Sequence, residues 1–454
     1  LSNRLESLYH ILCTYTMVLP ESVIDKSLNS RLLQQIRRNG SQNRVTAYII
    51  FMIRRKIMDQ IGIIAEFNPL HTGHAHLIRT VRERYGKEAV ITVIMSGSFV
   101  QRGEPAFFDK FDRTTFALSC GCDLVFELPT LYALSYASTF AAGAARLAAS
   151  VGVSTLVCGS EQGSGSLYEK LARRAESQFV QTRLKEALNH RVSYGQALLT
   201  ALQADDASSA PLLATPNGIL AFSYAAAIRK YSLPEKLEVV YRNTARPDIY
   251  TSASQLRKIC SERKNAEDCL SFIPPSCRTL FSDLIKNGKY INYERYDDAV
   301  LLQGRLLTES DLQSLAAFTE GLENRWHKVM KNATSLTESL KAVKTKRYMY
   351  SRLRRMAAYT LLGIEKETAT DYLYEAPPYA RLLGASCRGR EVLNNRRKSG
   401  QIPVITKFAD ADFEAPYKEL LRLDAKATDI QHFLFHNPAA RNGLADWKTP
   451  PVMT

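Results

Sequence analysis

The alternation of short apolar runs with helical patterns between residues 58 and 160 is the feature that most narrows the fold. Four runs are largely apolar and too short for helices: 61–65, 89–95, 123–128 and 154–158. They are separated by helical patterns at 73–85, 110–119 and 138–150. Strands buried on both faces and joined by helices are typical of a parallel sheet. We therefore predict an α/β fold with a doubly wound parallel sheet, which binds ligands outside the carboxyl ends of its strands.

The rest of the chain is mostly helical in pattern. Helices dominate 165–235, a further strand is predicted at 237–241, and Ser252 or Ser254 caps a helix that follows. After about residue 265 nearly all patterns are helical. We predict a catalytic domain at 58–264 and a mostly α-helical C-terminal domain at 265–454. Residues 1–57 have weak periodicity, and we expect an N-terminal extension there, either disordered or a mis-assigned start.

Two histidines stand at the point where the first strand gives way to a helix. His71-Thr72-Gly73-His74 follows an Asn68-Pro69 turn and opens the helix. Backbone N–H groups and the helix dipole make this an anion site, and Gly73 lets a ligand approach closely. Each imidazole can donate an N–H to a phosphate oxygen and stabilise charge as pyrophosphate leaves. The alternative is that both histidines cap the helix or lie on the surface.

Positive charge is concentrated in two segments. The net charge is +15, of which residues 331–400 carry +9 and residues 1–57 carry +6. One block mixes tyrosines with cations, which suits RNA because cations meet phosphates and rings stack on bases. The candidate RNA-binding residues are Lys344, Lys346, Arg347, Tyr348, Arg352, Arg354 and Arg355. The alternative is a solvated charged face.

Several long motifs carry a resemblance to a known family. GIIAEFNPLHTGHAHL, MSGSFVQRGEPAFFDKFDRTTFAL and GCDLVFELP resemble the HIGH-type nucleotidyltransferases, and specifically the bacterial tRNA(Met) cytidine acetate ligase family. The similarity continues through LVCGSE, TPNGILAFSY, SASQLRK, TKRYMYSRLRRM and ATDI. It covers nearly all of 58–435 and does not cover 1–57.

The resemblance implies a concrete activity. Members of the family activate acetate with ATP to acetyl-adenylate and pyrophosphate. They then acetylate the exocyclic amine of the wobble cytidine in elongator tRNA(Met), which gives N4-acetylcytidine. ATP is thus expected as a substrate, with Mg²⁺ neutralising the departing pyrophosphate. The expected partners are acetate and this tRNA.

The resemblance also assigns site residues. His71 and His74 would be catalytic. The ATP-binding loop of the family falls on Ile64, Ala65, Glu66, Phe67, Asn68, Pro69, Leu70, His71, Thr72, Gly73, His74, Ala75, His76 and Leu77. Further nucleotide contacts match Gly159, Asn217 and Arg242. The chain departs from the family at Gly218, where members often have a second asparagine. From the residues alone, Gly159 could be a plain turn glycine, Asn217 a helix cap and Arg242 one end of a salt bridge.

Two further groups are candidates. Ser252, Ser254 and Arg257 resemble the second signature of the superfamily, which holds the triphosphate; the alternative is a capped helix with a surface arginine. Gln101, Arg102 and Lys110 follow the second strand and could line the substrate pocket, or else belong to a loop packed by aromatic residues. Lys110 and Arg113 could also meet phosphate.

Two other functions remain open at this point. A small-molecule adenylyltransferase acting on a phosphopantetheine or mononucleotide would share the histidine motif, and a non-catalytic RNA-binding protein would share the basic block. No run of eighteen apolar residues is present, so we expect no membrane span and no membrane partner. The eight cysteines lack metal-ligand spacing, so we predict no protein-held metal, reduced thiols and a cytoplasmic location.

Overall fold

The structure is a computed structural model that describes residues 60–190, 192, 194–242, 252–263, 265–345, 348–396 and 402–454. The predicted N-terminal extension lies outside these residues. In this part of the chain, no single helix is long and apolar enough to cross a membrane. One bent pair of helices, Ala207–Leu213 with Pro216–Lys230, meets the length and composition test.

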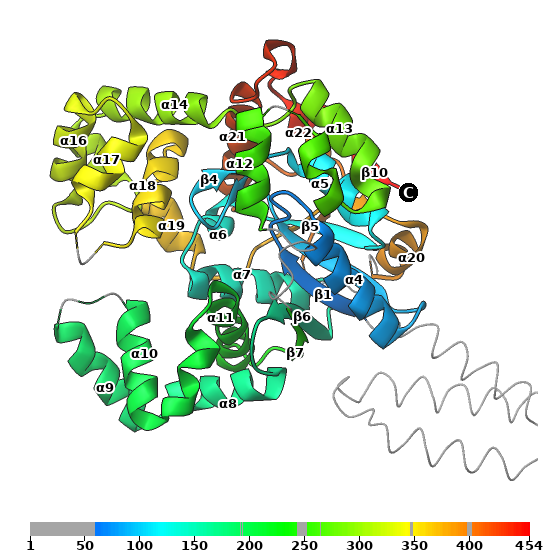
Figure 1. The fold of residues 1–454 in the computed structure, drawn as a ribbon, viewed down its shortest axis with the longest axis horizontal. Helices are drawn as coiled ribbons and strands as arrows, with labels where there is room; N and C mark the ends of the chain where they lie inside the picture. The colour runs from blue at the N-terminus through cyan, green and yellow to red at the C-terminus, as the bar shows by residue number, and fades with distance from the viewer. Residues whose placement is uncertain are drawn as a thin grey trace, which may run out of the picture. The chain divides into compact units, whose positions relative to one another are not determined.

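A mostly parallel sheet runs through the protein (Figure 1). Its strand order is β10-β8-β5-β2-β1-β6-β7, and β9 pairs with β8. All pairs in this sheet are parallel except β5 with β8. A separate hairpin is formed by β3 and β4. The strands are β1 Gln60–Ala65, β2 Val90–Ser96, β3 Phe99–Val100, β4 Glu104–Pro105, β5 Leu124–Leu128, β6 Thr155–Ser160, β7 Lys236–Tyr241, β8 Ala380–Ala385, β9 Val404–Ile405 and β10 Val452–Met453.

The α-helices cover both faces of the sheet, as the predicted doubly wound fold requires (Figure 1). Helices α4 and α5 pack with α12 and α13 in one apolar core, whereas α7 and α11 pack together on the other face. The helices are α4 Thr72–Tyr85, α5 Lys110–Ser119, α6 Thr130–Ala133, α7 Ala137–Ser150, α8 Gly165–Ala175, α9 Gln178–Asn189, α10 Tyr194–Asp205, α11 Pro216–Lys230, α12 Ala253–Arg263, α13 Arg278–Lys286, α14 Tyr293–Leu306, α15 Glu309–Ser314, α16 Leu322–Asn332, α17 Leu336–Val343, α18 Tyr350–Leu362, α19 Lys366–Tyr372, α20 Cys387–Arg396, α21 Lys418–Phe433 and α22 Ala445–Lys448.

The chain order of the strands places the ligand edge. From β1 the chain winds to β2 and β5 on one side, and then crosses to β6 and β7 on the other. The direction of winding therefore reverses between β1 and β6. Side chains that follow β1, β6 and β7 meet at one edge of the sheet, which is where doubly wound folds bind nucleotides.

The region after residue 265 is mostly helical, as predicted, but it also contributes strands. β8 pairs antiparallel with β5, and β9 and β10 pair with β8. No strand was predicted there. The last part of the chain therefore completes the sheet of the first part. The domain boundary between residues 264 and 265 stays a prediction.

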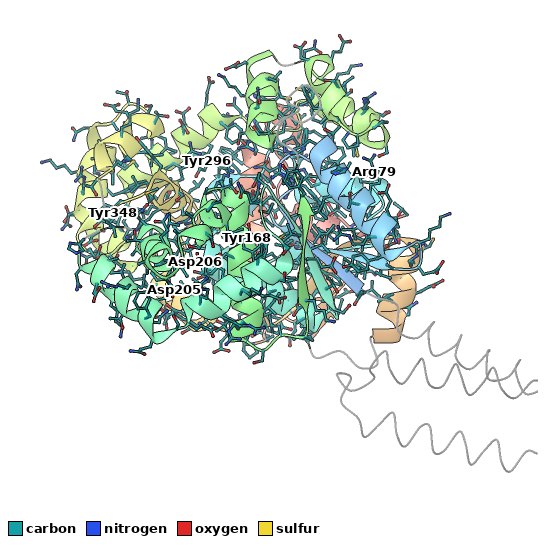
Figure 2. The ribbon with its side chains drawn as sticks, turned by 60° about the horizontal axis from the view of Figure 1, so that its bottom comes forward. Arg79, Tyr168, Asp205, Asp206, Tyr296 and Tyr348 are labelled. Atoms are coloured by element: carbon teal, nitrogen blue, oxygen red, sulfur yellow. The ribbon has the colours of Figure 1, made fainter. Side chains whose placement is uncertain are left out.

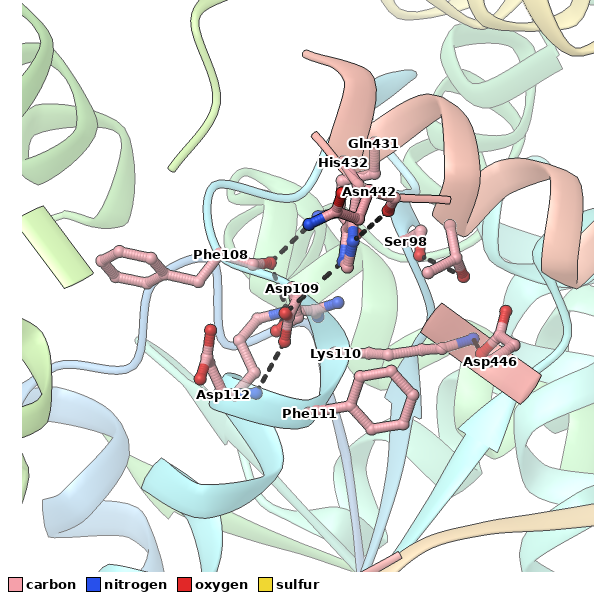
Figure 3. A network of polar contacts seen from close by, with 12 residues as sticks. Ser98, Phe108, Asp109, Lys110, Phe111, Asp112, Gln431, His432, Asn442 and Asp446 are labelled. Atoms are coloured by element: carbon pink, nitrogen blue, oxygen red, sulfur yellow. Dashed lines mark hydrogen bonds and ion pairs between the residues drawn. The ribbon is translucent and has the colours of Figure 1, made fainter. Parts of the chain in front are cut away.

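Buried charges join the C-terminal segment to the sheet. The Lys110 ammonium lies 2.8 Å from Glu127 Oε1 and 2.7 Å from Asp446 Oδ1, and all three side chains are buried. Arg381 on β8 reaches the same two carboxylates, at 3.1 and 2.6 Å. Figure 3 shows Lys110 reaching toward Asp446 and the nearby His432 facing Asp109, with 3.5 Å between His432 Nε2 and Asp109 Oδ2. We call Lys110, Glu127, Arg381 and Asp446 the buried charge cluster.

Tyr168 on α8 fixes the chain that leaves β6. Its hydroxyl lies 2.8 Å from Ser160 Oγ and donates to the carbonyl oxygens of Gln162 and Leu212. Arg174, also on α8, pairs with Asp205 and Asp206 at the end of α10. Tyr168 and the two aspartates are labelled in Figure 2. The helices that follow β6 thus hold its carboxyl end in place.

Candidate functional site

The two motif histidines cap helix α4 reciprocally. His71 is the N-cap, and its Nδ1 accepts a hydrogen bond of 3.0 Å from the Gly73 N–H. His74 Nδ1 in turn accepts from the His71 N–H at 3.3 Å. This is the geometry of a capping box built from imidazoles. The rings lie face to face at a tilt, with centroids 4.0 Å apart, and Phe67 packs edge-on against His74. The alternative that both histidines cap the helix is therefore confirmed.

These caps use only the Nδ1 atom of each imidazole, so Nε2 can still bind a ligand. Because Nδ1 accepts in both rings, a neutral imidazole carries its hydrogen on Nε2. Burial and the Arg242 charge lower the pKa of His71 to about 4. Burial, His71 and Arg242 hold the pKa of His74 well below its ordinary value. Near pH 7 both rings are thus neutral Nε2–H donors with a fixed orientation.

The low pKa of His71 has a consequence for stability. Between pH 6.5 and 4 the unfolded chain binds this proton and the folded chain does not, so acidification favours unfolding. The contribution of His71 is about 3 kcal/mol between pH 7 and 4. His71→Asn keeps an N-cap acceptor but removes the titrating group. We expect the variant to lose less stability than wild type over this range, as measured by denaturant unfolding at each pH. Equal losses would contradict the assignment.

A second group of side chains gathers where β6 and β7 end. The Asn217 amide donates to Glu161 Oε1 at 2.6 Å, and Thr215 Oγ1 donates to Glu161 Oε2 at 2.8 Å. Arg242 Nη1 lies 3.8 Å from Glu161 Oε1. A Cβ added to Gly159 would lie 2.9 Å from Arg242 Cδ. The structure therefore brings the predicted residues Gly159, Asn217 and Arg242 together around Glu161.

Two details of this group differ from the sequence predictions. The N-cap of α11 is Thr215, whose hydroxyl accepts from the Gly218 N–H, so the alternative role of Asn217 as a cap is wrong. Pro216 takes the first helical position, which places the cap one residue earlier. Glu161 was not singled out in the sequence. It could have been found in the sequence as an acidic residue that directly follows a predicted buried strand, at the ligand edge of the sheet.

The Arg242 charge links the two groups. It lowers the pKa of both His71 and His74, and it neighbours Glu161. Its side chain is 40% exposed, so it can still receive an anion. The guanidinium thus lies where the ends of β1, β6 and β7 converge, as a phosphate-binding group at a switch point would.

The start of helix α12 lies beside the turn that follows β1. Ser252 Oγ caps this helix by accepting from the Gln255 N–H at 3.2 Å. Arg257 donates to the Asn68 carbonyl at 2.7 Å and pairs with Glu104. Ser254 Oγ is 3.4 Å from Arg102 Nη1. The predicted triphosphate group is thus next to the histidine motif, although Arg257 already has protein partners. Its role with the triphosphate stays a prediction.

The β3–β4 hairpin brings Gln101 and Arg102 to the same edge. The Gln101 N–H donates to Glu66 Oε1 at 2.9 Å, and Glu66 directly follows β1. Burial raises the pKa of this carboxyl, although the Gln101 hydrogen bond opposes the shift. Arg102 is exposed. This placement is compatible with the predicted substrate pocket.

Lys110 and Arg113 need correction. Lys110 is fully buried in the buried charge cluster, which argues against a place in the substrate pocket. Arg113 is also fully buried and donates to backbone carbonyls, among them Glu66 O at 2.7 Å and Ser96 O at 2.9 Å. It ties together the ends of β1 and β2. Neither side chain reaches a phosphate site, because each is committed to partners inside the protein.

The predicted RNA-binding block is only partly exposed. Lys344 and Arg354 are exposed, and Arg352 is half-buried. The Tyr348 ring is buried under Arg352 and its hydroxyl donates to Glu320, so the predicted stacking on RNA bases is disfavoured. Arg355 is also buried. Lys346 and Arg347 lie outside the described residues.

Comparisons with known proteins agree with this geometry. Residues 58–446 match the HIGH Nucleotidyl Transferase family. The tRNA(Met) cytidine acetate ligase of Syntrophomonas wolfei is 31% identical over 411 residues, which cover 86% of this chain and 99% of that protein. That of Leuconostoc citreum is 34% identical over 399 residues, which cover 86% and 96%.

A solved structure is similar over the same length. Thermotoga maritima TmcAL, bound with alpha-thio ATP, superimposes with a TM-score of 0.81 at 29% identity. The match covers 87% of this chain and 99% of that one. The likeness is therefore not confined to the nucleotide edge.

Proposed function

The chain belongs to the HIGH nucleotidyltransferase family and, within it, to the tRNA(Met) cytidine acetate ligases, and we propose that it is such an ATP-dependent ligase. It activates acetate as acetyl-adenylate and acetylates the exocyclic amine of the wobble cytidine of elongator tRNA(Met). The observation that carries nucleotidyl transfer is the pair of neutral, mutually capped histidines at the switch point. Similarity to curated ligases over nearly their whole length supports the choice of substrates.

In the first step an acetate oxygen attacks the α-phosphorus of ATP and pyrophosphate leaves. His71 and His74 donate their Nε2–H groups to the α-phosphate as its negative charge grows. Because their orientation is already fixed by the capping box, little reorganisation is needed at that moment. Arg242 adds a charge that is present at every stage. No covalent enzyme intermediate is required, since the substrate itself is the nucleophile.

In the second step the cytidine amine attacks the acetyl carbonyl carbon and AMP leaves. The mixed anhydride hydrolyses readily, so it must be kept from water between the steps. The hairpin that carries Gln101 and Arg102 lies over the end of β1 and supplies part of this shielding. The exposed cations Lys344 and Arg354 supply phosphate contacts for the tRNA. The site of action is the cytoplasm.

We propose that Mg²⁺ arrives with ATP rather than in a site of the protein. Among the described residues, no group of three or more histidine, cysteine or acidic side chains is placed to hold a metal ion. Mg²⁺ commonly keeps several waters and binds through substrate phosphates. It would neutralise the departing pyrophosphate.

Gly159→Ala should weaken ATP binding without unfolding the protein. The new methyl group would press on Arg242 Cδ and Cγ, at 2.9 and 3.0 Å, and this side chain can move aside. The displaced guanidinium then no longer lies beside Glu161 and the histidines. We expect the KM for ATP in pyrophosphate exchange to rise about tenfold, which corresponds to about 1.4 kcal/mol, with an unchanged melting temperature. Gly195→Ala is the matched control, because nothing lies within 4 Å of its added Cβ.

The proposal is tested by incubating the purified protein with ATP, radiolabelled acetate and a tRNA(Met) transcript. N4-acetylcytidine should form at the wobble position only when all three are present. A product made from a phosphorylated small molecule without tRNA would instead favour the small-molecule adenylyltransferase. Tight tRNA binding with no ATP turnover would favour the non-catalytic RNA-binding protein.

A further inference from the structure

Tyr136 is an exposed aromatic side chain at the ligand edge of the sheet. It is the N-cap residue of α7 and follows β5 after the short helix α6. Tyr136 is 52% exposed, whereas Leu134 and Ser135 before it are buried. The chain that leads to Tyr136 is thus packed inside the protein, while Tyr136 itself is accessible at the start of α7.

One face of the Tyr136 ring is covered by a buried cation. The guanidinium carbon of Arg355, on α18, lies 4.5 Å from the ring centroid. Arg355 itself is only 7% exposed and donates to the Gln101 carbonyl at 3.3 Å. A guanidinium on one face leaves the other face of the ring for a ligand, and the cation favours an electron-rich or anionic partner.

The same contacts connect Tyr136 to the nucleotide site. Gln101 accepts from Arg355 through its carbonyl and donates to Glu66 through its N–H, so two contacts join Arg355 to the residue that follows β1. The β3–β4 hairpin also packs closely against the backbone of α18 at Gly103. A Cβ added to Gly103, where φ is +80°, would lie 2.4 Å from the Arg355 backbone nitrogen.

The spacing of the strands agrees with this connection. β2 lies between β1 and β5 in the sheet. At about 4.8 Å per strand, the ends of β1 and β5 lie about 10 Å apart. Tyr136 follows β5 after helix α6, and its link to the end of β1 runs through Arg355, Gln101 and Glu66.

We propose that the exposed face of Tyr136 is the surface on which the target cytosine stacks, with Arg355 holding the ring. The proposal rests on the proposed function, because it names the site that receives the base in the second step. Base–aromatic stacking selects an unpaired, splayed base, and the hairpin tip sets the distance between that base and the acetyl group. Tyr136 is exposed and can stack on a base, whereas the predicted stacking residue Tyr348 is buried.

The test compares two half-reactions in Tyr136→Leu, Tyr136→Phe and a control. Leucine is apolar but smaller than tyrosine, and it has no π-face. We expect kcat/KM for tRNA acetylation to fall about 5- to 150-fold in Tyr136→Leu, the range that one stack supports, while acetate-dependent pyrophosphate exchange falls far less. Tyr136→Phe should retain acetylation within about threefold of wild type, since the π-face remains. Tyr194→Leu changes a similarly exposed tyrosine at the first residue of α10 and should change neither rate.

Each outcome is decisive. Acetylation at the wild-type rate in Tyr136→Leu would overturn the proposal. A parallel loss of exchange and acetylation would also overturn it, because it would show a structural role. Failure of the proposed function looks different, since wild-type protein would then show no acetate-dependent exchange. A tRNA carrying the fluorescent analogue pyrrolocytidine at the wobble position gives a second readout. Its emission should be quenched by wild type and Tyr136→Phe and brighter with Tyr136→Leu.

Discussion

His74→Ala is expected to lower the rate of acetate-dependent ATP–pyrophosphate exchange by about 10²- to 10³-fold, the usual effect of removing one donor to a developing oxyanion. The substitution removes the Nε2–H that donates to the α-phosphate in the proposed mechanism. It also removes the acceptor for the His71 N–H, so the orientation of the second imidazole suffers as well. Exchange of labelled pyrophosphate into ATP measures the first half-reaction without any tRNA.

The control for this prediction is His74→Gln. Glutamine is the residue that normally occupies this position of a capping box, so its oxygen can still accept from the His71 N–H. Its amide can supply part of the lost donation. We expect an intermediate exchange rate and a melting temperature close to that of wild type. An exchange rate in His74→Ala equal to that of wild type would contradict the catalytic role. Unfolding of both variants would show that His74 acts only as a structural cap.

Lys110→Met is expected to destabilise the protein by about 3–5 kcal/mol. The substitution leaves Glu127 and Asp446 buried with only Arg381 to balance them. An uncompensated buried charge is costly because neither water nor another cation can reach it. Denaturant unfolding of the purified variant measures the change.

A matched surface lysine shows what burial contributes. Lys258 pairs with Glu262 at 3.8 Å, and both side chains are largely exposed, so Lys258→Met should cost at most about 1 kcal/mol. The double variant Lys110→Met, Asp446→Leu should recover part of the lost stability, because it removes one of the two carboxylates that Lys110 balances. Equal effects of the two lysine substitutions would show that the cluster contributes nothing beyond a surface pair.

The sequence was sufficient for the elements whose signals are local. The helix at Lys110–Ser119 has the predicted bounds, and the first strands and helices differ from prediction by one or two residues. Their apolar runs and caps lie within the segment itself. The histidine motif was visible in the same way, because it lies between a strand and a helix. Gly159, Asn217 and Arg242 were assigned only through the resemblance to the family, since each also fitted a plain structural role.

What the sequence did not show depends on contacts between distant segments. β8 contains Arg381, and a charged residue argues against a buried strand unless its acidic partners are known. Those partners, Glu127 and Asp446, are far away in the sequence. The burial of Lys110 follows from the same cluster. For the same reason the exposure of Tyr136 and the burial of Tyr348 could not be distinguished by composition.

The central claim is that acetate oxygen attacks the α-phosphorus of ATP at the paired histidines, and isotope transfer tests it most directly. The protein would be supplied with ATP, tRNA(Met) and acetate labelled with ¹⁸O in both oxygens, and the products would be examined by mass spectrometry. The account predicts one ¹⁸O atom in the AMP released and none in pyrophosphate. Label in inorganic phosphate or pyrophosphate, or unlabelled AMP beside acetylated tRNA, would contradict activation through acetyl-adenylate.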